Sequence, residues 1–280
     1  MQTIKSFAAL VVSSALLAAC GPAGEVPPAA SADNAQSNAH PARIDGHPNL
    51  NGVWQAMNTA NWNLEGGPMQ ANPEFWRLGA LFGVPPGESV VEGGTIPYLP
   101  EALEQRTKNR AGWPANDPEA KCYRGGIPRS TYLPYPFQIV QGDGDIMFVY
   151  EYATSNRAVR MANHLDPKEV LVDQWNGWSN GHWEGDTLVI EVFGLIRDTW
   201  LDRSGNFHQG MTVTERYTPM GENHIQYSAT ITDPRTFSRP WTISMPLYRR
   251  MEPNAEVFEY KCVELAEPLL YGRLLKEPIK

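Results

Sequence analysis

The densest run of ionisable side chains lies at residues 197–208 and includes Asp202, Arg203 and His208. A histidine moves protons near neutral pH, a neighbouring carboxylate orients its ring, and a guanidinium stabilises an anionic intermediate. These three residues therefore predict a cofactor-independent lyase, isomerase or hydrolase. A structural explanation is equally simple: Asp202 caps the backbone N–H groups of a turn and pairs with Arg203 at the surface, and His208 is a half-buried polar residue.

Aromatic side chains cluster just before this run. Trp175, Trp178, His182 and Trp183 fall within nine positions. Such density suits a stacking wall for a sugar, a sterol or a phenolic ring, although packing beneath a long loop explains it too. The candidate ligand-binding residues are Trp175, Trp178, His182, Trp200, Tyr132 and Arg129.

Other catalytic motifs are weak. Residues 177–181 read Gly-Trp-Ser-Asn-Gly, but a serine-hydrolase elbow needs a helix after the serine, and a strand pattern follows here. The 6 histidines show no His-x-His or His-Glu-x-x-His spacing, and there is no Walker loop or Gly-x-Gly-x-x-Gly motif. We therefore expect no metal and no cofactor.

The N-terminus has the layout of an export signal. Lys5 precedes an apolar run over residues 7–17, and small residues lead to Cys20. The ending Leu-Ala-Ala-Cys resembles a lipobox, which implies removal of residues 1–19 and acylation of Cys20. Residues 20–46 are small and polar and predict a flexible tether. We expect a membrane-anchored protein that faces the periplasm. In a Gram-negative cell, Gly21 rather than Asp after the cysteine favours sorting of the protein to the outer membrane. The alternative is a secreted protein with Cys20 as a spare thiol.

The remaining cysteines and the net charge limit the possibilities further. Cys122 and Cys262 remain in a chain bound for an oxidising compartment, so a disulfide is expected, with two buried free thiols as the alternative. The formal net charge is −8, and the chain has no lysine or arginine cluster. Nucleic acid is therefore not an expected partner.

The C-terminal half predicts antiparallel strands joined by short turns. Runs of large residues alternate with polar ones, as in a sheet with one buried face, and Gly/Asp turns separate them. The predicted strands are residues 137–141, 146–152, 181–192 around a turn at 184–186, 211–217, 224–232, 241–248 and 256–262. A sheet of this many strands leaves no exposed edge strand if it closes into a barrel, so we expect a barrel.

The N-terminal half of the folded part is less regular. Residues 49–55 predict one strand, and residues 73–83 and 100–112 predict helices that begin at proline and end at glycine. We expect a single, mainly β domain over residues 47–280. A helical and irregular insertion, at about residues 57–136, follows its first strand.

The first strand carries a resemblance. Residues 49–54 read Asn-Leu-Asn-Gly-Val-Trp, which resembles the Gly-x-Trp signature of lipocalins and related calycin barrels. That likeness implies that Trp54 packs across the closed end of the barrel beneath a late arginine, Arg249 or Arg250. Residues 128–136, 183–188 and 245–250 also resemble a group of secreted bacterial lipoproteins of unknown function, which implies no activity.

Three functions follow from these patterns. The first is a membrane-anchored barrel that binds a small apolar or aromatic molecule. The second is the enzyme that uses His208, Asp202 and Arg203. The third is a structural envelope lipoprotein without a ligand. Chemistry requires that His208 titrate inside a cavity, whereas passive binding tolerates its replacement.

Overall fold

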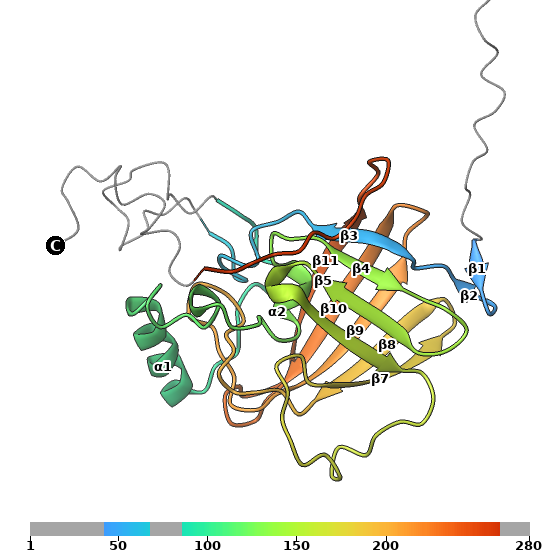
Figure 1. Cartoon of the computed structure of the whole chain (residues 1–280). Helices are drawn as coiled ribbons and strands as arrows, with labels where there is room; N and C mark the ends of the chain where they lie inside the picture. Colours follow the sequence, from blue (N-terminus) through green and yellow to red (C-terminus); the bar gives the residue numbers. More distant parts are fainter. Residues whose placement is uncertain (1–41, 68–85, 264–280) are drawn as a thin grey trace, which may run out of the picture. The chain divides into compact units, whose positions relative to one another are not determined.

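The computed structural model describes residues 42–67 and 86–263. The predicted signal peptide, Cys20 and the predicted helix at 73–83 lie outside the described residues. Within them the chain is mainly β and forms a closed barrel of nine strands (Figure 1). The barrel strands are β3 (Gly52–Ala56), β4 (Phe137–Val140), β5 (Ile146–Tyr150), β6 (Ser155–Arg160), β7 (Trp178–Glu184), β8 (Thr187–Phe193), β9 (Thr212–Pro219), β10 (His224–Thr232) and β11 (Trp241–Arg249).

Alternation of side chains explains the long strands of the C-terminal half. In β10 every second residue from Ile225 to Ile231 is buried and the intervening ones are more exposed, and β9 and β11 repeat this pattern. The register pairs Tyr227 with Tyr217 on one side and with Met245 on the other. The predicted barrel fold is therefore confirmed.

Two strand predictions were wrong in detail. Residues 155–160 form β6, which the sequence pattern did not predict, and β6 pairs with β7 in parallel rather than antiparallel. Residues 256–262 belong to no strand. The barrel is thus mixed, and its one parallel seam lies between β6 and β7.

The first barrel strand meets the expectation from the calycin resemblance. Trp54 is buried and its indole N–H donates to the carbonyl of Leu50 at 2.9 Å. The guanidinium carbon of Arg249 lies 4.3 Å from the centroid of the Trp54 ring. Arg249, not Arg250, is therefore the arginine that covers this tryptophan.

The insertion after β3 closes a gap in the barrel wall. β11 pairs with β3 only through residues 247–249. Nearer the start of β11, Glu92 donates to the carbonyl of Thr242 and Ser244 donates to that of Val90. The helix α1 (Pro100–Ala111) confirms the predicted one, and the short helix α2 (Arg129–Tyr132) precedes β4.

Covalent and terminal contacts complete the domain. Cys122 and Cys262 form a disulfide, as predicted. Residues 42–46, assigned from the sequence to the tether, instead begin the hairpin of β1 (Arg43–Ile44) and β2 (His47–Pro48). Arg43 of this hairpin forms an ion pair with Asp186 at 2.6 Å.

Side chains fill the middle of the barrel. Phe137, Phe148, Tyr217 and Tyr227 are each 0% exposed. Their rings contact one another, with centroids 6.1 Å apart for Phe137 and Phe148, 5.3 Å for Phe148 and Tyr217, and 5.0 Å for Tyr217 and Tyr227. A side chain that lines a ligand-sized cavity keeps accessible surface, so these four line none. This part of the interior is a packed core and not a hollow cup.

Candidate functional site

The loop between β8 and β9 contains the three predicted catalytic residues, but Asp202 has a local role. Its carboxylate accepts hydrogen bonds from the backbone N–H groups of Leu64, Ser204 and Asn206. The side chains of Ser204 and Asn206 donate to it as well, at 2.8 and 2.6 Å. Asp202 caps the turn, as the structural explanation proposed, but it is fully buried and does not pair with Arg203 at the surface, because Arg203 pairs with Glu119.

His208 is buried and both ring nitrogens have partners. Nδ1 accepts from the backbone N–H groups of Gly210 and Met211 at 3.2 and 3.4 Å. Nε2 therefore carries the proton and donates to the Thr199 hydroxyl at 2.8 Å. Burial lowers the pKa of His208 to about 4, so the ring is neutral near pH 7. Both ring nitrogens are therefore occupied by bonds within the loop.

Arg203 belongs to a buried ionic network. Its Nε and Nη2 atoms donate to the two carboxylate oxygens of Glu119, both at 2.9 Å. Arg129 donates to both oxygens of Asp117, at 3.0 and 3.1 Å, and to Glu119 at 2.8 Å. Burial alone raises the pKa of Glu119, but the positive charges of Arg203 and Arg129 outweigh it and lower that pKa to about 2. These ion pairs join the loop that contains Arg203 to the segments that contain Glu119 and Arg129.

The predicted catalytic group is therefore not assembled. His208 bonds Thr199 and local backbone, Asp202 bonds its own turn, and Arg203 bonds Glu119. Two predicted ligand-binding residues, Arg129 and Tyr132, also direct their polar atoms to other groups of the protein. All three guanidinium nitrogens of Arg129 bond Asn61, Asp117 or Glu119, and the Tyr132 hydroxyl donates to the Leu201 carbonyl at 2.7 Å.

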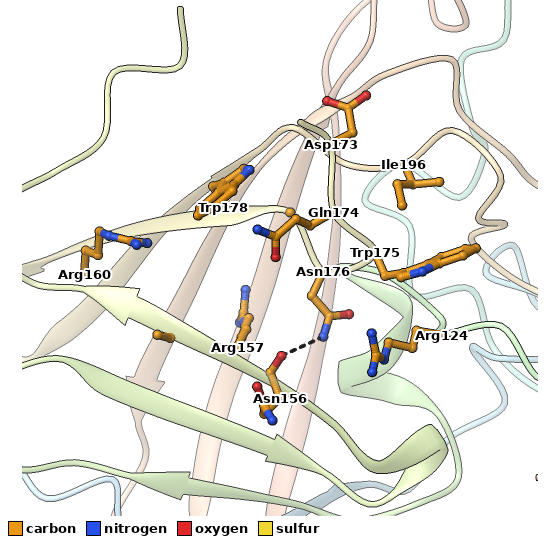
Figure 2. A pocket seen from close by; sticks show the side chains of 12 residues that line it. Arg124, Asn156, Arg157, Arg160, Asp173, Gln174, Trp175, Asn176, Trp178 and Ile196 are labelled. Carbon is orange, nitrogen blue, oxygen red and sulfur yellow. Dashed lines mark hydrogen bonds between the residues drawn. The ribbon is translucent and has the colours of Figure 1, made fainter. Parts of the chain in front are cut away.

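The parallel seam between β6 and β7 opens a pocket in the barrel wall. Only two residue pairs join the strands, Val159 with Ser179 and Arg160 with Asn180. The chain before these pairs diverges, and a pocket of about 440 Å³ lies there, which we call the seam pocket (Figure 2). Its lining residues are Arg124, Asn156, Arg157, Ala158, Arg160, Asp173, Gln174, Trp175, Asn176, Gly177, Trp178 and Ile196.

Two half-buried tryptophans stand at opposite sides of the seam pocket (Figure 2). The indole N–H of Trp178 donates to the carbonyl of Val172 at 2.9 Å, which fixes the ring. The Trp175 ring packs against Tyr123 with centroids 5.0 Å apart. Both rings are thus held in place by protein contacts before any ligand arrives, and a site built in advance binds at lower entropic cost.

Amide and guanidinium groups form the floor between these rings. Asn176 Nδ2 donates to the Ser155 hydroxyl at 2.8 Å and to the Asn156 carbonyl at 3.2 Å, which ties the two diverging chains together. Figure 2 draws the second of these bonds. Gly177 has φ +63°, and a Cβ there would lie 2.7 Å from the Phe193 carbonyl oxygen. The floor therefore needs glycine at this position.

Arg157 connects the floor of the seam pocket to the barrel core. Its Nη1 forms an ion pair with Glu215 at 2.6 Å, and its Nη2 donates to the Tyr217 hydroxyl at 3.3 Å. The hydroxyls of Tyr217 and Tyr227 donate to the other oxygen of Glu215, at 3.0 and 2.8 Å. Arg157 also lies over the ring of Phe148 at 4.6 Å. These contacts fix the guanidinium.

The remaining predicted ligand residues lie elsewhere. His182, further along β7, lines a second pocket of about 450 Å³, beside Trp183, whose ring stacks on His47 with centroids 4.6 Å apart. Trp200 lines a third pocket of about 320 Å³. Of the six predicted residues, only Trp175 and Trp178 line the seam pocket.

Sequence reasoning missed the arginines of the seam pocket. Arg157 and Arg160 lie on β6, whose inward positions include polar Ser155 and Arg157 and so lack the apolar alternation of a strand. Arg124 comes from a distant loop. Ser179 lies buried within β7 and accepts from Arg157 at 3.5 Å, so no elbow forms around it.

Comparison with known proteins adds no family. No protein-family model matches the chain, and no curated protein or solved structure matches it significantly. Among the described residues, no group of three or more His, Cys, Asp or Glu side chains is placed to hold a metal ion. No helix within those residues is long and apolar enough to cross a bilayer.

Proposed function

We propose that this protein is an exported, membrane-anchored lipoprotein that binds a small ring-containing molecule in the seam pocket. The observation that carries the proposal is the pair of fixed, half-buried tryptophans on opposite sides of a pocket of about 440 Å³. Ligand sites in proteins commonly have volumes of about 300–1,000 Å³ and combine aromatic walls with a few polar groups.

The chemistry of the wall indicates the type of ligand. A half-buried indole presents an apolar face while its edge stays hydrogen-bonded, and such faces stack on aromatic or sugar rings. The side chains of Asn156, Gln174 and Asn176 add directional donors and acceptors around them. Since the barrel core around Phe148 and Tyr217 is filled, the wall is the better place for a ligand than the interior.

Export and anchoring rest on the sequence, and one structural feature supports them. Lys5, the apolar run and Cys20 form the signal and lipidation pattern. The Cys122–Cys262 disulfide suits an oxidising compartment such as the periplasm. Acyl chains on Cys20 would supply the membrane affinity, because the acidic domain has no attraction to anionic lipid.

Ligand binding is tested with a neutral ring. Calorimetric titration of 2-naphthamide into the purified protein should show saturable binding, and Trp175→Ala or Trp178→Ala should weaken it up to about 10-fold, the value of one aromatic contact. Trp183→Ala removes another half-buried tryptophan of β7 outside the pocket and serves as the control. Equal affinities for Trp178→Ala and Trp183→Ala would contradict the proposed site.

Anchoring is tested separately by fractionating cells that express Cys20→Ala. We expect an uncut precursor or a protein released from the membrane fraction. A variant that stays on the membrane after a salt wash would argue against the lipid anchor.

A further inference from the structure

The seam pocket gathers positive charge on an acidic protein. The whole chain has 31 acidic residues and 23 lysines and arginines. The lining of the seam pocket reverses this balance, because Arg124, Arg157 and Arg160 face a single acid, Asp173. Like charges are gathered only at a cost in repulsion, so their presence in one pocket points to a ligand of opposite sign.

Two of these arginines have no acidic partner. Within residues 42–67 and 86–263, neither Arg124 nor Arg160 forms an ion pair with a carboxylate. Several arginines elsewhere are paired, as Arg129 is with Asp117 and Arg216 with Glu184, whereas Arg197 and Arg239 lie exposed on the surface without an ion pair among the described residues. The pocket therefore keeps two guanidinium groups available, each with a planar fork of donors that matches a carboxylate.

The free guanidinium groups lie at opposite ends of the pocket. Figure 2 shows Arg160 beyond Trp178 at one end and Arg124 below Trp175 at the other. The Arg160 guanidinium carbon is 5.5 Å from the centroid of the Trp178 ring. Each end thus combines a cation with an indole, and the floor between them is formed by Arg157, Asn156 and Asn176.

The middle of the floor is electrically balanced but not saturated with hydrogen bonds. Glu215 neutralises Arg157. Arg157 Nε and Asn176 Oδ1 have no hydrogen-bond partner among the described residues, although their side chains are only 4% and 6% exposed. Both atoms are themselves buried, so the charge that a ligand meets in the pocket comes from Arg124 and Arg160.

We propose that the seam pocket is specific for an organic dianion, a planar ring system with an acidic group toward each end. This inference rests on the proposed function and adds the class of ligand. The ring lies between the two indoles, one acidic group meets Arg160, and the other meets Arg124. A ring with one acidic group can pair with only one of the two arginines, and a neutral ring pairs with neither.

The experiment compares three probes of nearly the same ring size. Calorimetric titrations at low salt use naphthalene-2,6-dicarboxylate, 2-naphthoate and 2-naphthamide. Each exposed ion pair is worth up to about 5-fold in affinity, so we expect the diacid to bind about 25-fold more tightly than the amide and the monoacid to fall between. Raising the NaCl concentration should weaken binding of the diacid and leave the affinity for the amide unchanged.

Variants locate the two contacts. Arg124→Gln and Arg160→Gln should each reduce the affinity for the diacid by about 5-fold and leave that for 2-naphthamide unchanged. Arg239→Gln removes an equal charge from an exposed position outside the pocket and should leave the affinities for the diacid and for 2-naphthamide unchanged. Equal binding of all three probes would overturn the dianion inference while the ring-binding proposal stands. Absence of binding by every probe would overturn both.

Discussion

Replacement of His208 by glutamine tests whether a buried neutral histidine holds the loop between β8 and β9. Burial lowers the pKa of His208 from 6.5 to about 4 in the folded protein. Between these values the unfolded chain binds a proton that the folded protein refuses. The folded state is therefore destabilised as the pH falls from 6.5 toward 4.

The magnitude follows from the size of the shift. One pKa unit corresponds to about 1.4 kcal/mol, so the full shift is worth roughly 3 kcal/mol and the part between pH 6.5 and pH 5 about 2 kcal/mol. At pH 7, His208→Gln should cost about 1–2 kcal/mol, because glutamine does not reproduce both the Thr199 bond and the bonds from Gly210 and Met211. At pH 5 the variant should equal or exceed the wild type in stability.

Urea unfolding followed by circular dichroism at pH 7 and pH 5 measures these differences. This range stays above pH 4.5, so carboxylate protonation contributes little. His224→Gln, at an exposed histidine, is the control and should follow the wild-type change with pH. A stability difference between His208→Gln and wild type that is the same at both pH values would refute the buried neutral state. It would also reopen the catalytic hypothesis for this residue.

Three further predictions use the same unfolding assay. Reducing the disulfide of Cys262, which closes a loop across a sequence separation of 140, should lower the free energy of unfolding by up to about 5 kcal/mol, and peptide mapping should find the linked pair in the native protein. Glu119→Gln leaves two buried arginines undercompensated and should cost about 3–5 kcal/mol at pH 7. Because the folded pKa of Glu119 is lowered to about 2, the wild type should lose this advantage as the pH falls from about 4.5 to 2. Arg249→Met, which uncovers Trp54, should cost about 2 kcal/mol, and an unchanged stability would argue against the contact.

The strands that were predicted correctly share one physical property. β9, β10 and β11 each have one face in the core, so apolar side chains recur at every second position and identify the strand. β6 turns Ser155 and Arg157 inward, where they bond Asn176 of the loop before β7 and Glu215 of β9, and polar residues at inward positions remove the signal. Residues 256–262 differ in the opposite way: their sequence is typical of a strand, yet they form none, and the disulfide of Cys262 ties them to the domain.

The candidate site was predictable only where its residues are neighbours in the sequence. Trp175 and Trp178 were found because aromatic density is visible in a short window. The arginines of β6 reach the same pocket through the parallel pairing of β6 with β7, and Arg124 reaches it beside the contact of Tyr123 with Trp175, neither of which a local pattern indicates. The non-local pairing that forms the seam is thus also what concealed most of its lining.

Density of charge misled the sequence reading for a physical reason. The run that contains Asp202 and Arg203 is rich in charge because buried turns and loop junctions must satisfy their own polar groups, and both of these residues bond other protein groups, whereas Arg197 and Asp198 are exposed. Arg124 and Arg160 stand apart from such runs and form no ion pair with a carboxylate among the described residues. A cluster of charges in a sequence is therefore not by itself an indicator of a ligand site.

The buried ion pair of Arg157 and Glu215 lies between the seam pocket and the barrel core. Removing Arg157 and Glu215 from water is costly, and a hydrophobic pair of similar volume would often be at least as stable. What the pair provides here is position, because Glu215, itself held by two tyrosine hydroxyls, fixes the guanidinium of Arg157. In the proposed site this guanidinium is therefore in place before a ligand binds.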